Sequence, residues 1–255
     1  MLRDVICLGV AGNFANHLSQ AGEDADFRDI KTTEESEPKG IFPFYLPGSK
    51  SFLGRYPISL DNLELPQNDN AQVEPEIGIL FDVEYNSDKS VKDIIAKKFT
   101  VFNDTTIRKE GAKKISQKKN WSSASKGIAS EWIDIDSFDN GGVMDSFRLK
   151  SYIIRDETIY DYGVDAPLLG YSYFYKKLQK WLVDKINNQK DFGPLEDIAK
   201  AFRESNYPKK LFVTIGATAY TEFGQNNYIE PNDKIVVQSY CTKSGKTIKL
   251  EQIAI

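Results

Sequence analysis

The stretch of sequence that decides the fold spans positions 74 to 83 and reads EPEIGILFDV. Apolar residues occupy every second position from Ile77 to Val83, which predicts a β-strand beginning at Glu76. Side chains two positions apart on a strand point to the same side, so the carboxylates of Glu74 and Glu76 should project together. Their oxygens could share one hard divalent cation. The same pattern is also typical of a solvated strand end in an acidic protein.

A second acidic segment follows, with the sequence FNDTTIR at positions 102–108. We expect a strand over 99–102 and a helix over Thr106–Lys119. Asp104 then fits two roles: a third carboxylate ligand, or the N-cap of that helix. Arg108, one turn further on, could hold an anionic group.

Two other residues are candidates for chemistry. Lys126 follows a hydroxyl-rich loop, NWSSAS at 120–125, and could orient water or stabilise negative charge; it could equally be an exposed loop lysine. His17 is the only histidine, on a short polar turn, and suits a general base or a structural role. Because the chain has a single histidine, a metal site built from carboxylates is favoured over a zinc site. Carboxylates bind magnesium, manganese or calcium.

Composition limits the class of protein. The chain has 255 residues, 33 Lys and Arg against 37 Asp and Glu, and 40% hydrophobic residues, enough for one large folded domain. A net charge of −4 gives no electrostatic reason to bind nucleic acid or an anionic membrane. The apolar run at positions 5–10 is too short for a signal peptide, and cysteines at 7 and 241 form no zinc pattern or disulfide framework. We therefore expect a soluble, cytoplasmic protein.

Elsewhere strands predominate. Helices are predicted over Ser87–Lys97, over Leu168–Ile186 and from Pro194, and a mobile polar loop over Glu23–Glu37. Because strands outnumber helices without regular alternation, the pattern predicts an α+β, β-rich fold.

Taken in order, these segments resemble the fumarylacetoacetate hydrolase superfamily across almost the whole chain. The matching motifs are Gly12-Asn13-Phe14 through His17, Glu74-x-Glu76, Asp104 through Arg108, Trp121 through Lys126-Gly127, and Ile229-Glu-Pro-Asn-Asp233. The resemblance implies a mixed β-roll with peripheral helices, formed by one domain over residues 1–255. Residues 1–66 would hold the N-terminal strand and a lid, and residues 67–255 the metal-binding core.

The resemblance also implies the site. Mg²⁺ or Mn²⁺, with Ca²⁺ as a further alternative, would be held by Glu74, Glu76 and Asp104. His17, on the lid, would be the base that activates water, and Lys126 would face the substrate. The residues expected to contact substrate are Asn13, Arg108, Ser125, Gly216 and Thr218.

The implied activity is metal-dependent cleavage of a C–C bond, by hydrolysis or decarboxylation, in a small β-dicarbonyl or 2-oxo acid. An isomerase or tautomerase on the same scaffold is an alternative, and so is a catalytically inactive, ligand-binding dimer. The resemblance also implies a fold that usually dimerises, so a homodimer is expected.

Three positions depart from the family pattern. Gln20 stands where hydrolytic members have a glutamate, and it cannot accept a proton from the histidine. Leu46-Pro47 replaces a Lys-Pro pair, with Lys50 as a displaced substitute, and Gly216-Ala217-Thr218 replaces a Gly-Thr-Pro loop. The metal ligands are therefore complete, whereas the substrate-recognition groups are altered.

Overall fold

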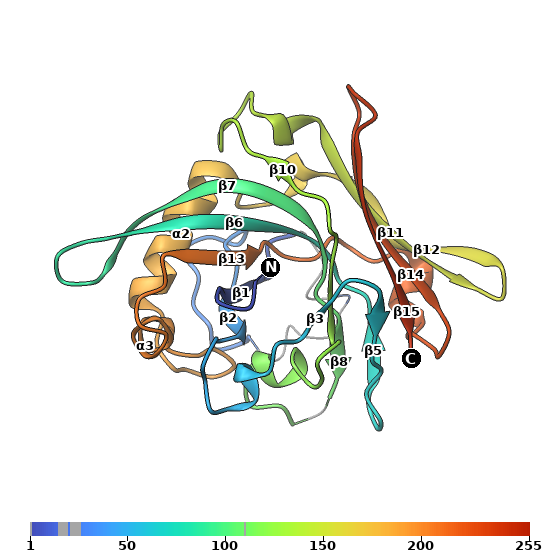
Figure 1. Cartoon of the computed structure of the whole chain (residues 1–255), viewed down its shortest axis with the longest axis horizontal. Coiled ribbons are helices and arrows are strands. Elements are labelled where there is room, and N and C mark those ends of the chain that lie inside the picture. The colour runs from blue at the N-terminus through green and yellow to red at the C-terminus, as the bar shows by residue number, and fades with distance from the viewer. Residues whose placement is uncertain (1, 15–19, 21–26, 110) are drawn as a thin grey trace.

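The computed structural model describes residues 2–14, 20, 27–109 and 111–255. Most of the regular structure in these residues is β-strand, and the helices lie at the periphery (Figure 1). This confirms the α+β, β-rich fold that the sequence predicts. No helix in the described part of the chain is both long and apolar enough to cross a membrane.

The larger sheet contains the stretch 74–83. In order across the sheet, its strands are β2 (Gly40–Tyr45), β1 (Ile6–Ala11), β13 (Lys210–Thr214), β6 (Pro75–Tyr85), β7 (Val91–Asn103), β9 (Lys126–Ile128) and β3 (Ile58–Ser59), with β10 (Ile133–Asp134) beside β7. β1 runs parallel to β13, whereas β6 pairs antiparallel with β13 and with β7. The sheet is therefore mixed, and its long β6–β7 hairpin curls over the molecule (Figure 1).

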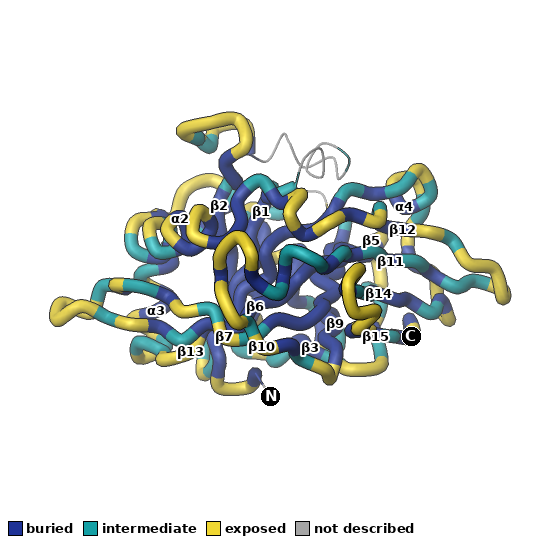
Figure 2. The backbone as a smooth tube through the Cα atoms, turned by 90° about the horizontal axis from the view of Figure 1, so that it is seen from above, coloured by how far each residue is buried: buried dark blue, intermediate teal, exposed yellow. Residues whose placement is uncertain are grey.

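Two smaller sheets complete the roll. The first contains β12 (Thr158–Pro167), β11 (Phe147–Arg155), β14 (Lys234–Cys241), β15 (Thr247–Ala254) and β4 (Asn62–Leu63), and the second pairs β5 (Asn70–Gln72) with β8 (Thr106–Arg108). Buried residues concentrate along the centre of the molecule, and exposed residues lie mainly on loops and at hairpin tips (Figure 2). β8 follows the end of β7 after a short connection that contains Asp104.

Three helices are described. They are α2 (Tyr175–Asn188), which packs on β7, α3 (Ile198–Glu204), which packs on α2, and α4 (Glu222–Asn226), beside β12. Leu178, Leu182 and Ile186 recur at helical spacing on α2 and are at most 1% exposed. Short 3-10 turns occur at Phe52–Gly54, Ile115–Lys118, Val143–Ser146 and Leu168–Gly170.

The helix predicted over Ser87–Lys97 is wrong, because β7 begins at Val91. Ile94 is fully buried while Ile95 is 41% exposed, the alternation of a strand rather than of a helix. Pairing with β6 along the hairpin supplies the backbone hydrogen bonds. That pairing is non-local, so a short window of sequence does not reveal it.

The helix predicted over Thr106–Lys119 is also wrong. Its first residues form β8, which pairs with β5, and only Ile115–Lys118 makes a 3-10 turn. Asp104 therefore caps no helix, which removes one of the two roles open to it.

The two later helices exist but begin further along the chain. The one predicted over Leu168–Ile186 begins at Tyr175, after an extended segment in which the Tyr171 hydroxyl donates to the Gly216 carbonyl at 2.8 Å. The one predicted from Pro194 begins at Ile198, where the Asp197 side chain accepts a hydrogen bond from the Lys200 N–H.

The loop predicted over Glu23–Glu37 is fixed at its C-terminal end. Glu37 is 4% exposed, and its carboxylate accepts hydrogen bonds from Thr33 and from the Trp181 indole N–H at 3.0 Å. Lys185 lies 3.1 Å from the same carboxylate. Glu37 is therefore anchored by its contacts, the mobility of the loop remains a prediction, and residues 23–26 lie outside the described residues.

Candidate metal centre

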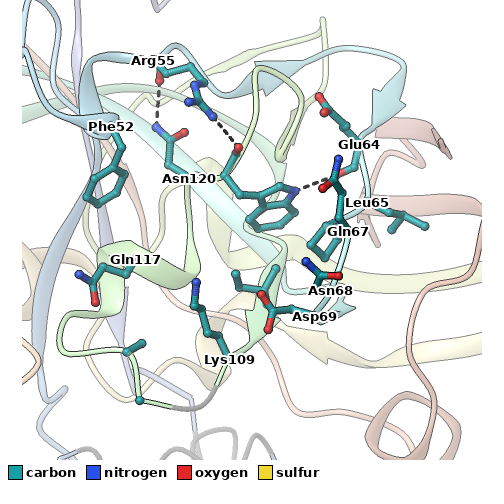
Figure 3. Close-up of a pocket in the computed structure, with 15 residues that line it drawn as sticks. Phe52, Arg55, Glu64, Leu65, Gln67, Asn68, Asp69, Lys109, Gln117 and Asn120 are labelled. Carbon is teal, nitrogen blue, oxygen red and sulfur yellow. Dashed lines mark hydrogen bonds between the residues drawn. The ribbon is translucent and has the colours of Figure 1, made fainter.

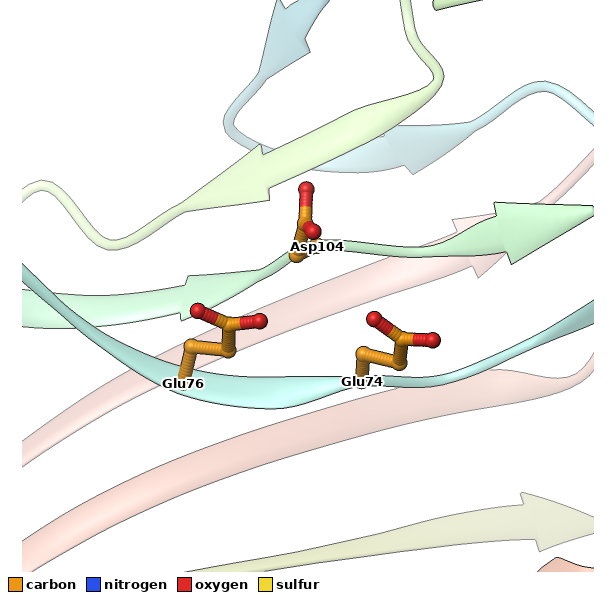
Figure 4. Close-up of side chains that lie close together, drawn as sticks. All are labelled: Glu74, Glu76 and Asp104. Atoms are coloured by element: carbon orange, nitrogen blue, oxygen red, sulfur yellow. The ribbon is translucent and has the colours of Figure 1, made fainter. Parts of the chain in front are cut away.

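Three carboxylates converge where β6 begins and β7 ends. Glu74 and Glu76 point to the same side of the chain, toward Asp104 on the connection from β7 to β8 (Figure 4). One oxygen from each residue lies within 4.8 Å of the other two, and none of the three residues is more than 3% exposed. The predicted convergence is confirmed; that these residues bind a metal remains a prediction.

The backbone fixes this arrangement. The Asp104 N–H donates to the Glu74 carbonyl at 2.9 Å, and the Glu74 N–H donates to the Asn103 side chain at 3.3 Å. These bonds continue the β6–β7 pairing, in which Pro75 lies opposite Asn103. The third carboxylate is therefore brought beside the first by the sheet register.

A buried amide pair ties the cluster to the second sheet. The Asn103 side chain donates to Oε1 of Gln252 on β15 at 3.0 Å. The Gln252 side-chain N–H groups donate to the carbonyls of Asn62 at 2.9 Å and of Lys126 at 3.3 Å. One glutamine therefore connects strands from both sheets behind the carboxylates.

Glu76 is held by the Gly216 loop. The Gly216 N–H donates to Oε2 of Glu76 at 2.8 Å, at a backbone φ of +107° that favours glycine. Burial raises the pKa of Glu76 well above its usual range, and the charge of Asp104 adds to the effect. Glycine at this position thus allows a backbone donor to reach the carboxylate.

Asn13 braces the same loop from the other side. Its amide N–H groups donate to the carbonyls of Tyr173 at 2.9 Å and Ile215 at 2.8 Å, and its Oδ1 accepts from the Tyr173 N–H at 2.8 Å. Both N–H groups are thus engaged by the main chain. Asn13 therefore positions the wall of the site, and its predicted contact with substrate remains a prediction.

Lys126 pairs with Asp104. Its Nζ lies 2.8 Å from Oδ1 of Asp104 and donates to the Thr105 carbonyl at 2.5 Å, and the residue is fully buried. Burial lowers the pKa of Lys126 to about 8, while the charge of Asp104 acts in the opposite direction. In this structure Lys126 fixes a carboxylate, and its predicted contact with substrate remains a prediction.

Sequence reasoning missed Lys119, which enters the cluster more deeply than Lys126. Its Nζ lies 2.5 Å from Oε2 of Glu74 and 2.7 Å from Oδ2 of Asp104, and its side chain is 3% exposed. The ring of Phe42 covers the ammonium at 5.2 Å. The lysine-rich stretch 113–119 has the pattern of a solvated surface, so nothing local indicates that one of its lysines is buried.

Arg108 forms the more open side of the cluster. Its Nε donates to Gln72 at 2.5 Å, its Nη2 donates to the Tyr220 hydroxyl at 3.1 Å, and Nη2 lies 3.7 Å from Oε1 of Glu74. The Arg108 side chain is 15% exposed. Gln72 and Tyr220 are two further residues that the sequence pattern does not single out.

Gln20 contacts the wall next to Arg108. Its Oε1 accepts from the Tyr220 N–H at 2.8 Å, and its Nε2 donates to the Tyr220 carbonyl at 3.3 Å. A glutamate could not make the second bond, because an ionised carboxylate has no donor. Glutamine at position 20 is therefore suited to holding this part of the chain against the Tyr220 main chain.

The other predicted residues have different positions. His17 lies outside the described residues, and Lys50 is on an exposed turn. The buried Ser125 hydroxyl donates to the carbonyls of Lys119 and Ser122 at 3.4 Å, bracing its own loop. Thr218 is buried, and its N–H donates to the Pro75 carbonyl at 3.3 Å.

A pocket of about 640 Å³ lies next to the loop that carries Lys119. Asn120 and Trp121 form part of its wall, and Arg55 and Lys109 lie around it (Figure 3). The Asn120 amide donates to the carbonyls of Phe44 and Arg55, which anchors the main chain beside Lys119. The three carboxylates are not among the residues that line this pocket.

The donor set fits a hard divalent cation. All the clustered ligand atoms are carboxylate oxygens, which Mg²⁺ and Mn²⁺ prefer. Three cationic side chains, those of Lys119, Lys126 and Arg108, also lie at the cluster and pair with Glu74 or Asp104. The buried triad could therefore hold a metal, in competition with side chains that already neutralise it.

Comparisons with known proteins agree with the fold. Cg1458 in complex with an inhibitor has a TM-score of 0.58 at 16% identity, covering 98% of this chain and 76% of that one. 2-Keto-3-deoxy-D-arabinonate dehydratase, complexed with magnesium and 2,5-dioxopentanoate, has a TM-score of 0.55 at 12% identity, with coverages of 98% and 73%. 5-Carboxymethyl-2-hydroxymuconate delta-isomerase from Mycobacterium smegmatis has a TM-score of 0.54 at 14% identity, with coverages of 98% and 78%.

These likenesses confirm the fold of the fumarylacetoacetate hydrolase superfamily that the motifs indicate. The search of curated proteins found no match. Residues 23–254 match a protein family, and this match covers most of the chain. The chain therefore belongs to the family of unknown function DUF5718.

Proposed function

We propose that this protein is a divalent-metal-dependent enzyme that stabilises the enolate of a small 2-oxo acid or β-dicarbonyl compound. The observation that carries the proposal is the convergence of Glu74, Glu76 and Asp104 in one buried cluster. The likeness in fold to a dehydratase complexed with magnesium and to an isomerase supports the same class of chemistry.

The residues around the cluster have separable roles in this proposal. A cation held by Glu74, Glu76 and Asp104 would supply positive charge to an enolate oxygen. The Arg108 guanidinium, partly exposed beside Glu74, would bind the substrate carboxylate. Lys126 would keep the carboxylate of Asp104 in place by charge and hydrogen bonding.

Among the C–C cleavages, the geometry at Gln20 favours decarboxylation over hydrolysis. Hydrolysis needs an activated water, and a glutamine docked on the Tyr220 main chain offers no carboxylate to support a histidine base. Isomerisation is the second candidate, because it also proceeds through an enolate and needs no activated water. A catalytically inactive, ligand-binding dimer is the alternative if no turnover is found.

One assay separates these reactions. Protein with Mg²⁺ is incubated in D₂O with oxaloacetate or an acylpyruvate and followed by NMR, and every rate is compared with that of Mg²⁺ alone. Decarboxylation gives pyruvate and carbon dioxide from oxaloacetate faster than the metal alone, and isomerisation puts deuterium at C3 of an intact substrate faster than spontaneous exchange. Hydrolysis of the acylpyruvate into two acids would contradict the reading of Gln20. No reaction with any substrate would favour the inactive dimer.

The role of the carboxylates is tested by Glu76→Gln. This variant should lose metal affinity and turnover together. Its matched control is Asp82→Asn on the same strand, where the carboxylate is 42% exposed and remote from the cluster. Equal loss in both variants, or retained metal binding in Glu76→Gln, would contradict the proposed ligand set.

We also propose that the enzyme is a homodimer, which light scattering of the purified protein can test.

A further inference from the structure

Lys119 presents its ammonium to two of the three carboxylates that would bind a metal. Its Nζ lies 2.5 Å from Oε2 of Glu74 and 2.7 Å from Oδ2 of Asp104, and 3.3 Å from the Asp104 carbonyl. Oxygen ligands lie about 2.0–2.6 Å from a bound Mg²⁺ or Ca²⁺. The ammonium therefore uses the same oxygens that a metal would need, at a similar distance.

Lys126 provides an internal comparison, because it bears the same charge and is equally buried. Its ammonium pairs with Oδ1 of Asp104 and donates to the Thr105 carbonyl, whereas Lys119 pairs with the other oxygen of Asp104, Oδ2. Lys119 pairs with both Glu74 and Asp104, and so joins the two acids. The two lysines therefore differ in position and not in charge.

From this geometry we infer that Lys119 is a built-in cation that competes with the divalent metal for Glu74 and Asp104. The inference goes beyond the proposed function, although the metal it concerns belongs to that proposal. Metal binding requires the Lys119 ammonium to leave the carboxylates. The four-carbon stem of lysine is flexible enough for such a movement, while Asn120 holds the adjacent main chain in place.

This competition has a measurable consequence for affinity. When the binding-competent form is only a fraction of the population, the apparent dissociation constant rises by the inverse of that fraction. Removing the ammonium should therefore tighten metal binding by about 10- to 100-fold if Lys119 occupies the carboxylates about 90–99% of the time. In the metal-free protein, the same contacts would offset part of the cost of burying Glu74 and Asp104.

The test is a titration of the full chain with Mn²⁺, after treatment with a chelator, in which free Mn²⁺ is measured by electron paramagnetic resonance. The variants are Lys119→Met and Lys126→Met, which remove the same charge. We expect Lys119→Met to bind Mn²⁺ about 10- to 100-fold more tightly than wild type, and Lys126→Met to change affinity by much less. Equal gains would mean that net charge alone is responsible, which would overturn the inference.

The remaining outcomes also decide the question. Equal, tight binding by wild type and Lys119→Met would overturn the competition but leave the proposed metal enzyme intact. Absence of binding in both would overturn the two proposals together. If Lys119→Met and Lys119→Gln fold only when Mn²⁺ is present, the metal replaces the ammonium, as the inference requires. If neither variant folds even with Mn²⁺, the metal cannot take that place and the inference fails.

Discussion

Gln20 and Tyr220 are joined by two hydrogen bonds between a side-chain amide and a main-chain peptide group, although they are 200 positions apart in the sequence. Tyr220 in turn accepts a hydrogen bond from Arg108 through its hydroxyl group. The pair therefore links the N-terminal part of the chain to the side of the carboxylate cluster at which we expect a substrate carboxylate to bind.

Replacing Gln20 by glutamate should weaken this link. The variant loses the donor to the Tyr220 carbonyl and brings a charged oxygen toward it, so we expect a loss of about 1–3 kcal/mol in the free energy of unfolding. Urea denaturation near neutral pH measures the effect, with Gln20→Met as the control that lacks the charge. If the missing carboxylate is what disfavours hydrolysis, the glutamate variant should gain acylpyruvate hydrolysis. Its appearance would show that the missing carboxylate alone prevents hydrolysis.

Gly216→Ala should disturb the contact with Glu76. The backbone φ of +107° is strained for alanine, and a Cβ there would lie 3.0 Å from the Asn13 Cβ. We expect a loss of about 1–3 kcal/mol in stability and weaker Mn²⁺ binding, because the Gly216 N–H would shift away from Glu76. Gly245→Ala is a control with positive φ in an open turn, and it should lower stability without altering Mn²⁺ affinity.

Glu37 should stabilise the protein only while it is ionised. Burial disfavours the charged form, but hydrogen bonds from Thr33, Trp181 and Lys185 outweigh it and lower the pKa of Glu37 to about 2. A depressed acid pKa adds stability above the unfolded value of 4.5, and that stability is lost as pH falls from 4.5 toward 2. Glu37→Gln should therefore cost about 1–3 kcal/mol near neutral pH, and the difference from wild type should shrink in acid. A difference that is independent of pH would contradict this assignment.

Glu196, in contrast to Glu37, should lower the stability of the folded protein when it is ionised. Burial raises the pKa of Glu196 to about 7, against the effects of nearby Ser116 and of the Lys114 charge, and neither carboxylate oxygen has a hydrogen-bond partner among the described residues. Between the unfolded value of 4.5 and about 7, the folded protein binds the extra proton, so stability falls as pH rises through this window. Glu196→Gln should be more stable than wild type by about 1–3 kcal/mol at about pH 8 and show no such gain at about pH 4. Thermal unfolding at both values measures the difference.

The sequence predicts those parts of the site that depend on local geometry. Glu74 and Glu76 share one side because the period of a strand is two, and this holds whatever the rest of the chain does. Asp104 was predictable as a partner because a strand ends just before it. Its proximity to Glu74 nonetheless depends on the register of β6 against β7, which is set by pairing between the strands.

Contacts between distant segments were not predictable in the same way. Lys119 meets Glu74 across 45 positions, from a stretch whose many lysines resemble a solvated surface. The Ser87–Lys97 segment has a helix-like composition, but from Val91 onward it is a strand that pairs with β6. In both cases tertiary partners, which no local pattern contains, determine the structure.

The position of Gln252 affects the order in which the protein can assemble during synthesis. Its side chain bonds Asn103, Asn62 and the main chain of Lys126, so the support behind the carboxylates includes a residue translated after all of them. A nascent chain that has released β6 and β7 but not β15 has all three acids and lacks this support. Because domains generally fold as units, the centre should mature only after β15 has left the ribosome.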